Sequence, residues 1–190
     1  MERRFFDLNI DVYVPGRWYL AEPRNLDGQQ IEDIWQFIDG RRVEDPGPLR
    51  IPIFKPGRPI DIEFAGAGQT PIVSARVASV FRKMAPSDVQ LFPVEVEGTT
   101  DPYFLLNVAR TVRCIDDSAC GEVRLWTPEN RQPEKIGQYR VVSDLRIDKS
   151  KACEERVFRL WGWSSPIIID EELKQALEKT GIVGGRFDEV

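Results

Sequence analysis

The sequence predicts an α+β domain in which a mostly antiparallel sheet carries two or three helices packed on it. Two segments show helical signals, residues 72–84 and the segment that follows Asp170. Several other segments alternate between apolar and polar side chains, which is the period of a half-buried strand. Because helices and strands do not alternate regularly along the chain, a parallel doubly wound sheet is not expected.

The length of 190 residues fits one domain, and a hydrophobic fraction of 42% is enough for a sizeable core. We expect a single domain over 1–190 with two parts. Residues 1–70 are rich in proline and glycine and should be irregular, whereas 71–190 should form a more regular α+β core. Proline cannot donate to a strand ladder, so strands within 27–60 should be short or lie at an edge.

The spacing of apolar residues defines the first elements. Residues 5–14 alternate as a strand and end at the turn Pro15-Gly16, where proline presets φ and glycine supplies a positive φ. The helix at 72–84 should bury one apolar face, made of Val73, Val77, Val80, Phe81 and Met84.

Later elements carry equally local signals. The strands 89–96 and 103–115 should pair as a hairpin, and the second is apolar on both faces, as a central strand is. The final helix should begin with Asp170 as its N-cap and end near Gly181, which suits the left-handed position after a helix. Further short strands are expected at 123–126, 139–147, 157–161, 167–169 and 185–190.

The chain has no histidine. Histidine is the side chain whose ordinary pKa lies nearest neutrality, and it is the commonest metal ligand. Its absence removes Ser-His-Asp and Cys-His machinery and most zinc sites. Carboxylate, lysine and tyrosine chemistry remains open, but we expect a protein that binds and is not an enzyme, with no cofactor.

The cysteines are Cys114, Cys120 and Cys153. Three scattered cysteines do not make a disulfide framework, and their spacing is too loose for a zinc site. The N-terminus lacks the apolar stretch of a signal peptide, and no run approaches the ~20 apolar residues of a membrane helix. We therefore expect a cytoplasmic protein with reduced thiols and no membrane partner.

Carboxylate pairs are the candidates for catalysis that remain. Asp116 and Asp117 are adjacent in a predicted turn, and Asp61 and Glu63 share one face if their segment is extended. Paired carboxylates can exchange protons with a substrate or hold a metal ion. Adjacent acids in turns are more often caps or solvated groups, so catalysis is the weaker interpretation.

The net charge of −5 is concentrated in one stretch. Residues 85–120 hold six acids and two bases, which gives −4 for that stretch alone. A chain of this charge is not suited to coating nucleic acid, which requires clustered Lys and Arg. The stretch is either an ordinary solvated face or a surface for a basic partner.

An aromatic turn is the other candidate for contact with a partner. Trp161 and Trp163 flank Gly162, and glycine gives the backbone freedom between two large rings. Tryptophan in such a turn is either part of the core or an exposed anchor of the kind that dominates protein interfaces. A pocket beside this turn could alternatively bind a small molecule or a peptide.

Several stretches, in order along nearly the whole chain, resemble one family. It is the myxobacterial-type immunity domain of bacterial polymorphic toxin systems, formerly catalogued as domain of unknown function 1629. The stretches are PGRWYL at 15–20, GRP at 57–59, PIVS at 71–74, DVQLFPV at 88–94, YFLLNV at 103–108, CID at 114–116, VFRLW at 157–161 and GRF at 185–187.

The resemblance implies a cytosolic antidote that binds a toxin domain encoded nearby and blocks it by occlusion. Such toxins are often nucleases, which are expected to be basic because they hold phosphates. The family supplies no catalytic residue to carry over. Our hypothesis for the toxin-binding residues is Glu95, Glu97, Asp101, Asp116 and Asp117, with Trp161 and Trp163 as anchors.

Two alternatives stay open beside the immunity protein. One is a small-molecule or peptide-binding module, which a deep apolar pocket with few charges would favour. The other is a carboxylate-based enzyme, which a pocket holding two or more carboxylates of raised pKa would favour. The sequence predicts neither the identity of the toxin nor the oligomeric state.

Overall fold

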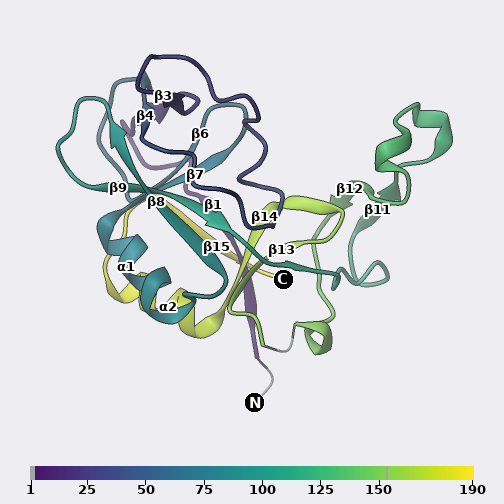
Figure 1. Cartoon of the computed structure of the whole chain (residues 1–190). Coiled ribbons are helices and arrows are strands. Elements are labelled where there is room, and N and C mark those ends of the chain that lie inside the picture. Colours follow the sequence, from purple (N-terminus) through teal and green to yellow (C-terminus); the bar gives the residue numbers. More distant parts are fainter. Residues whose placement is uncertain (1–2, 153) are drawn as a thin grey trace.

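Strands dominate the fold, which a computed structural model describes for residues 3–152 and 154–190 (Figure 1). Cys153 lies outside the described residues. Strands make up 39% of the chain and helices 15%, with two α-helices in the part that the structure describes. The predicted α+β class, a sheet with two or three helices packed on it, is therefore wrong, because the chain forms several sheets with little helix.

The larger sheet has six strands in the order β3-β4-β8-β9-β7-β6. Strands β4 and β8 pair in parallel, and the other neighbours pair antiparallel. The strands are β3 (Arg24–Asn25), β4 (Leu49–Ile51), β6 (Ile62–Ala65), β7 (Thr70–Ser74), β8 (Val89–Val96) and β9 (Tyr103–Val108).

The second sheet has five strands in the order β10-β13-β14-β1-β15, and β10 and β13 run parallel. Its strands are β1 (Phe5–Ile10), β10 (Thr111–Val112), β13 (Val157–Leu160), β14 (Trp163–Asp170) and β15 (Gly185–Glu189). The first strand of the chain thus lies between strands from its C-terminal end.

Smaller elements complete the fold. Two-stranded sheets form from β2 (Tyr19–Leu20) with β5 (Ile53–Lys55) and from β11 (Glu122–Leu125) with β12 (Tyr139–Ser143). The α-helices are α1 (Ala75–Met84) and α2 (Glu171–Lys179), and short 3-10 helices lie at Pro128–Asn130, Pro133–Lys135 and Lys149–Lys151.

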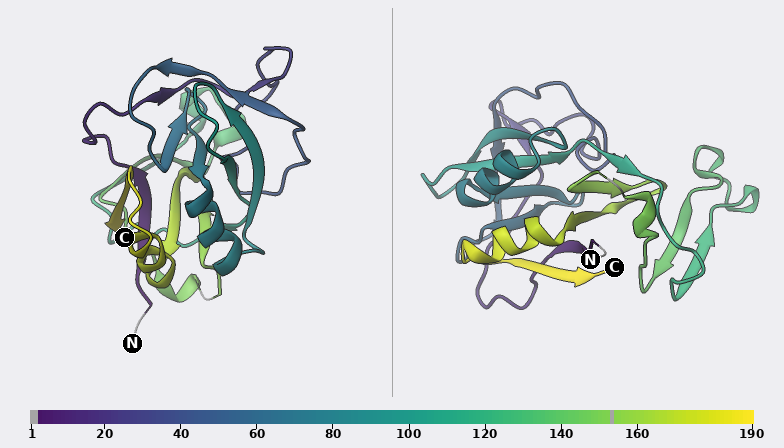
Figure 2. Two further views of the ribbon diagram at one scale, coloured as in Figure 1. Left: turned by 90° about the vertical axis from the view of Figure 1, so that its left-hand side faces the viewer. Right: turned by 90° about the horizontal axis from the view of Figure 1, so that it is seen from below.

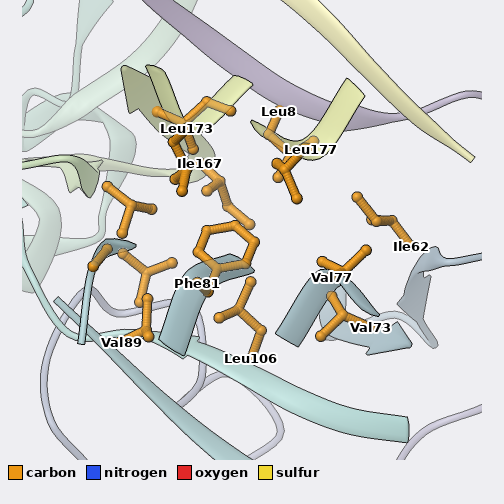
Figure 3. Close-up of a cluster of buried hydrophobic side chains, with 14 of the residues drawn as sticks. Leu8, Ile62, Val73, Val77, Phe81, Val89, Leu106, Ile167, Leu173 and Leu177 are labelled. Carbon is orange, nitrogen blue, oxygen red and sulfur yellow. The ribbon is translucent and has the colours of Figure 1, made fainter. Parts of the chain in front are cut away.

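The main core lies where the two large sheets and both α-helices meet (Figure 3). Phe81 of α1 is fully buried at its centre, with Leu173 and Leu177 of α2 on one side and Leu106 of β9 on the other. A buried leucine or phenylalanine contributes about 1.5–3 kcal/mol relative to exposure, so these helices are held by their apolar faces.

The inner strands β7 and β14 are buried on both faces, and their successive residues belong to different clusters of the core. In β7, Val73 belongs to the main core and its neighbour Ile72 to a second cluster under the N-terminal segment. In β14, Ile169 belongs to the main core and Ile168 to a third cluster under residues 113–152. Because side chains alternate across a strand, apolar runs of this kind need cover on both sides.

Residues 113–152 form an arm beside the five-stranded sheet. Its tip, which carries β11 and β12, stands apart from the two large sheets in Figure 1 and in the right-hand view of Figure 2. In the described residues, no helix is long and apolar enough to cross a membrane.

The two predicted helices exist, with one boundary shifted. The final helix begins as predicted, since the Asp170 carboxylate accepts a hydrogen bond of 2.8 Å from the Leu173 amide. The first helix begins at Ala75 and not at residue 72, because Ile72 and Val73 continue β7. Apolar spacing could not separate the end of that strand from the first helical turn.

Candidate functional site

Three of the predicted toxin-binding acids gather at the turn between β8 and β9. Glu95 is the penultimate residue of β8, and Glu97 and Asp101 flank the turn itself, where Gly98 has a φ of +77°. All three side chains are exposed. We call Glu95, Glu97 and Asp101 the turn acids.

The turn acids border a shallow hollow of about 420 Å³, to which Arg50 also contributes. Arg50 pairs with Glu95 at 3.4 Å across the β4–β8 pairing, and the Glu95 side chain stays 69% exposed. An exposed pair of this kind is worth at most about 1 kcal/mol. Three carboxylates and one guanidinium give the lining of this hollow a formal charge of −2.

The other two predicted acids have internal partners on the arm. Asp116 accepts hydrogen bonds from the Ser118 hydroxyl at 2.6 Å and from the backbone amides of Ser118 and Ala119. The Ser118 hydroxyl bond is the main cause that lowers the pKa of Asp116. Asp117 accepts a hydrogen bond of 2.8 Å from the Tyr139 hydroxyl.

The aromatic turn lies beside Asp117. The Trp161 ring is stacked by Arg113 at 4.2 Å and is 37% exposed, so its outer part is open to a partner. Trp163 is half-buried against the third core cluster. Gly162 has a φ of +73°, and a side chain there would meet the Tyr139 ring.

The seven predicted residues therefore form two groups. The loop between β8 and β9, which carries the turn acids, lies on the opposite side of the molecule from β11 and β12 in Figure 1 and in the right-hand view of Figure 2. We call Asp116, Asp117, Trp161 and Trp163 the arm group. The structure brings each group together and keeps the two groups apart.

Asp61 and Glu63, the other pair of carboxylates considered for catalysis, are bound by arginines. Asp61 is buried and accepts hydrogen bonds from Arg76, Ser74 and the Val183 amide. Burial raises its pKa, but these bonds outweigh burial, and the net pKa is lowered. Glu63 pairs with Arg17, and burial nevertheless raises its pKa. Asp61 and Asp116 are thus held ionised, which is the opposite of what a general acid needs.

Cys114 and Cys120, the cysteines that the structure describes, are not arranged for metal binding or nucleophilic chemistry. Cys114 is buried, and burial raises the pKa of its thiol to about 12. Cys120 is half-buried, and its sulfur accepts a hydrogen bond from the Arg146 amide at 3.3 Å. In the part of the chain that the structure describes, no group of three Cys, Asp or Glu side chains could hold a metal ion.

Comparison with protein families identifies the family of the chain. A family model described as immunity protein family (Imm11) matches residues 50–190. The chain belongs to this immunity protein family. The resemblance to an immunity domain is thereby confirmed, and no curated protein matches the chain.

The match spans most of this immunity protein. It begins at Arg50 in β4 and includes the turn acids and the arm group. Strands β1, β2 and β3 precede the matched range. They nevertheless pair with strands inside it, since β1 pairs with β14 and β3 pairs with β4.

Sequence reasoning missed a pocket in the N-terminal half of the immunity protein. It lies between β2 and β6 and contains the buried Arg17–Glu63 pair and the half-buried Glu22. Phe54, beside it, is 80% exposed. Phe54 was a local signal of this pocket. It is an apolar aromatic between Ile53 and Lys55 in a short edge strand, where one face of the strand is uncovered.

Proposed function

We propose that this immunity protein neutralises a cognate bacterial toxin by binding the toxin domain and occluding it. Membership of the immunity protein family is the observation that carries the proposal. The toxin would be encoded nearby in a polymorphic toxin system, and protection would take place in the bacterial cytoplasm. Action by occlusion requires one immunity protein for each toxin molecule.

The turn acids are the proposed first point of contact. Toxins that cut nucleic acid must hold phosphates, so their active surface is expected to be basic. A negative patch facing such a surface steers the two proteins together and raises the association rate, most strongly at low salt. The exposure of the turn acids and the weak pairing of Glu95 with Arg50 support this role.

The arm group is the proposed second contact. Trp161 offers a partly exposed ring, and tryptophan is enriched among residues that dominate binding energy. Asp117 adds charge beside it, whereas the carboxylate of Asp116 is engaged within its own turn. We therefore expect Trp161→Ala to weaken binding more than Asp116→Asn, which would mainly loosen the turn.

Co-expression with the neighbouring gene tests the proposal. The candidate toxin domain is expressed in a host that lacks this protein, alone or together with it. We expect growth arrest without the immunity protein, recovery with it, and a one-to-one complex on size-exclusion chromatography. A neighbour that is harmless alone, or protection without a complex, would overturn neutralisation by occlusion.

A further inference from the structure

A pocket of about 560 Å³ opens between β2, β6 and the end of β1. Its walls are mostly apolar and include Ile10, Leu20 and Phe64, and its charged residues are Arg17, Glu22 and Glu63. One base and two acids leave the pocket with a formal charge of −1. A pocket of this size accommodates a side chain or a small ligand.

The charges of Arg17 and Glu63 cancel each other in the wall of this pocket. The Arg17 guanidinium donates to the Glu63 carboxylate at 2.5 Å, and their side chains are only 7% and 5% exposed. The second carboxylate oxygen of Glu63 accepts the Phe64 amide, and Arg17 stacks on the Tyr19 ring at 4.0 Å. Glu63 is thus fully engaged, and the charge of Arg17 is paired, although its Nε has no hydrogen-bond partner among the described residues.

Glu22 is different, because half of its carboxylate is unused. Oε1 accepts a hydrogen bond of 2.9 Å from the Gly68 amide, whereas Oε2 is buried and has no hydrogen-bond partner among the described residues. A buried carboxylate oxygen without a donor is costly. A donor that enters the pocket would remove that cost once the Glu22 side chain turns its Oε2 toward it.

The turn Gly66-Ala67-Gly68 provides the space for this carboxylate. A Cβ at Gly66 would lie 2.2 Å from the Glu22 Cδ, and one at Gly68 would lie 3.3 Å from Oε2. The two glycines thus allow Glu22 to lie against the turn and face the pocket wall. Any side chain at residue 66 would displace the carboxylate.

An exposed apolar rim surrounds the opening. Phe54 is 80% exposed, Val12 is 51% exposed and Tyr19 is 37% exposed, and all three line the pocket. Large apolar groups that converge on a pocket mark sites of protein contact more often than isolated ones do. The rim would be buried by a partner that covers the opening.

The pocket is continuous with the turn acids through β5. Ile53 of β5 pairs with Leu20, a pocket residue, and its side chain lies next to Gly98 in the β8–β9 turn. The Glu97 amide also bonds to the Ile51 carbonyl at 3.0 Å, two residues before Ile53. A partner seated on the turn acids would therefore reach the pocket by crossing one short strand.

We infer that this pocket receives an arginine or lysine side chain of the toxin, with the alkyl stem against the apolar walls and the cationic head on Oε2 of Glu22. The negative pocket charge and the unused carboxylate oxygen select a cation over a neutral or anionic group. The stem length and apolar walls select a side chain over a simple ion. The inference rests on the proposed function for the identity of the partner.

The pocket itself is tested without the toxin. Butylguanidinium, a mimic of an arginine side chain, is titrated into the full chain, and backbone amide shifts are followed by NMR. We expect saturable shifts at Gly66 and Gly68, and about tenfold weaker binding for Glu22→Gln, since a charge-assisted hydrogen bond is lost. Neutral butylurea is the matched control. It should bind the wild type about as weakly as butylguanidinium binds Glu22→Gln.

Three outcomes of this titration would overturn the inference. They are equal binding of butylurea and butylguanidinium, unchanged affinity in Glu22→Gln, and no shifts in the pocket. Phe54→Ser changes an exposed rim residue and should leave the fold intact. If the amide spectrum of this variant keeps the wild-type pattern, any weaker binding reflects a lost contact and not a lost structure.

Toxin protection separates this inference from the proposed function. We expect Glu22→Gln and Phe54→Ser each to weaken the complex and reduce protection. If both variants protect fully while the wild type forms the complex, the pocket inference fails and neutralisation stands. If the wild type binds no toxin but binds butylguanidinium, neutralisation fails. The toxin is then also ruled out as the occupant of the pocket.

Discussion

Arg76 holds Asp61 with two hydrogen bonds of 2.5 Å, from Nε to one carboxylate oxygen and from Nη2 to the other. The same carboxylate accepts the Ser74 hydroxyl and the Val183 amide, both at 2.7 Å. One buried side chain thus joins the start of α1 to the segment between α2 and β15.

Replacing Asp61 should therefore destabilise the fold. In Asp61→Ala, the Val183 amide and the Ser74 hydroxyl lose their acceptor, and Arg76 loses its partner. We expect the free energy of unfolding to fall by about 2–4 kcal/mol, measured by urea denaturation. The exposed Asp27→Ala should change it by less than about 0.5 kcal/mol, and equal effects of the two variants would contradict the assignment.

Asp7 should make stability depend on pH in the mildly acidic range. Burial raises the pKa of this carboxyl to about 6, so the folded chain binds its proton more tightly than the unfolded chain does. This group's contribution is favourable at low pH and is lost as the pH rises through about 6. Asp7→Asn removes the titration.

The variant should accordingly gain stability relative to the wild type as the pH rises. We expect the difference in unfolding free energy to grow between pH 4 and pH 7, to about 1–3 kcal/mol. Urea titrations at several pH values measure it. Asn9 donates to Asp7 at 2.7 Å, and the amide oxygen of an asparagine can still accept that bond. A difference that does not vary with pH would contradict the raised pKa.

Gly66 should tolerate no side chain, for two separable reasons. Its φ is +63°, and a Cβ would collide with the Glu22 carboxylate. Gly16 has nearly the same φ, +64°, with nothing within 4 Å of a Cβ. Gly16→Ala should therefore cost only the backbone strain, about 1–2 kcal/mol, whereas Gly66→Ala should cost clearly more. Thermal unfolding of the two variants measures the difference, and equal losses would mean that Glu22 is not held as described.

Local sequence signals predicted the elements that depend on interactions between residues close in sequence. Asp170 caps α2 through its own side chain, and Val77 and Phe81 form one buried helical face. The β8–β9 hairpin also follows from alternation and a glycine turn. The balance of strand and helix did not follow, because β2 and β5 are only two and three residues long. Such strands are too short to show a period and are held by distant pairing.

The grouping of the acids could not be predicted either. Asp101 and Asp116 belong to the same acidic stretch of sequence, but β9 runs between them. A strand rises about 3.3 Å per residue, so β9 alone carries the chain roughly 20 Å from the turn. Proximity in sequence suggested one acidic face, and the structure divides it into the turn acids and the arm group. The Glu22 pocket joins segments more than 40 residues apart, and the aromatic Phe54 was its one local signal.

The association rate with the cognate toxin domain at low salt tests the central claim most directly. The triple variant Glu95→Lys, Glu97→Lys and Asp101→Lys is compared with a matched variant that carries lysine at Glu44, Glu154 and Glu178, exposed acids outside residues 85–120. Both have the same net charge. We expect the turn-acid variant to associate at least about tenfold more slowly than its control at low salt, with the difference shrinking as salt is added. Equal rates for the two variants at low salt would contradict a toxin-binding role for the turn acids.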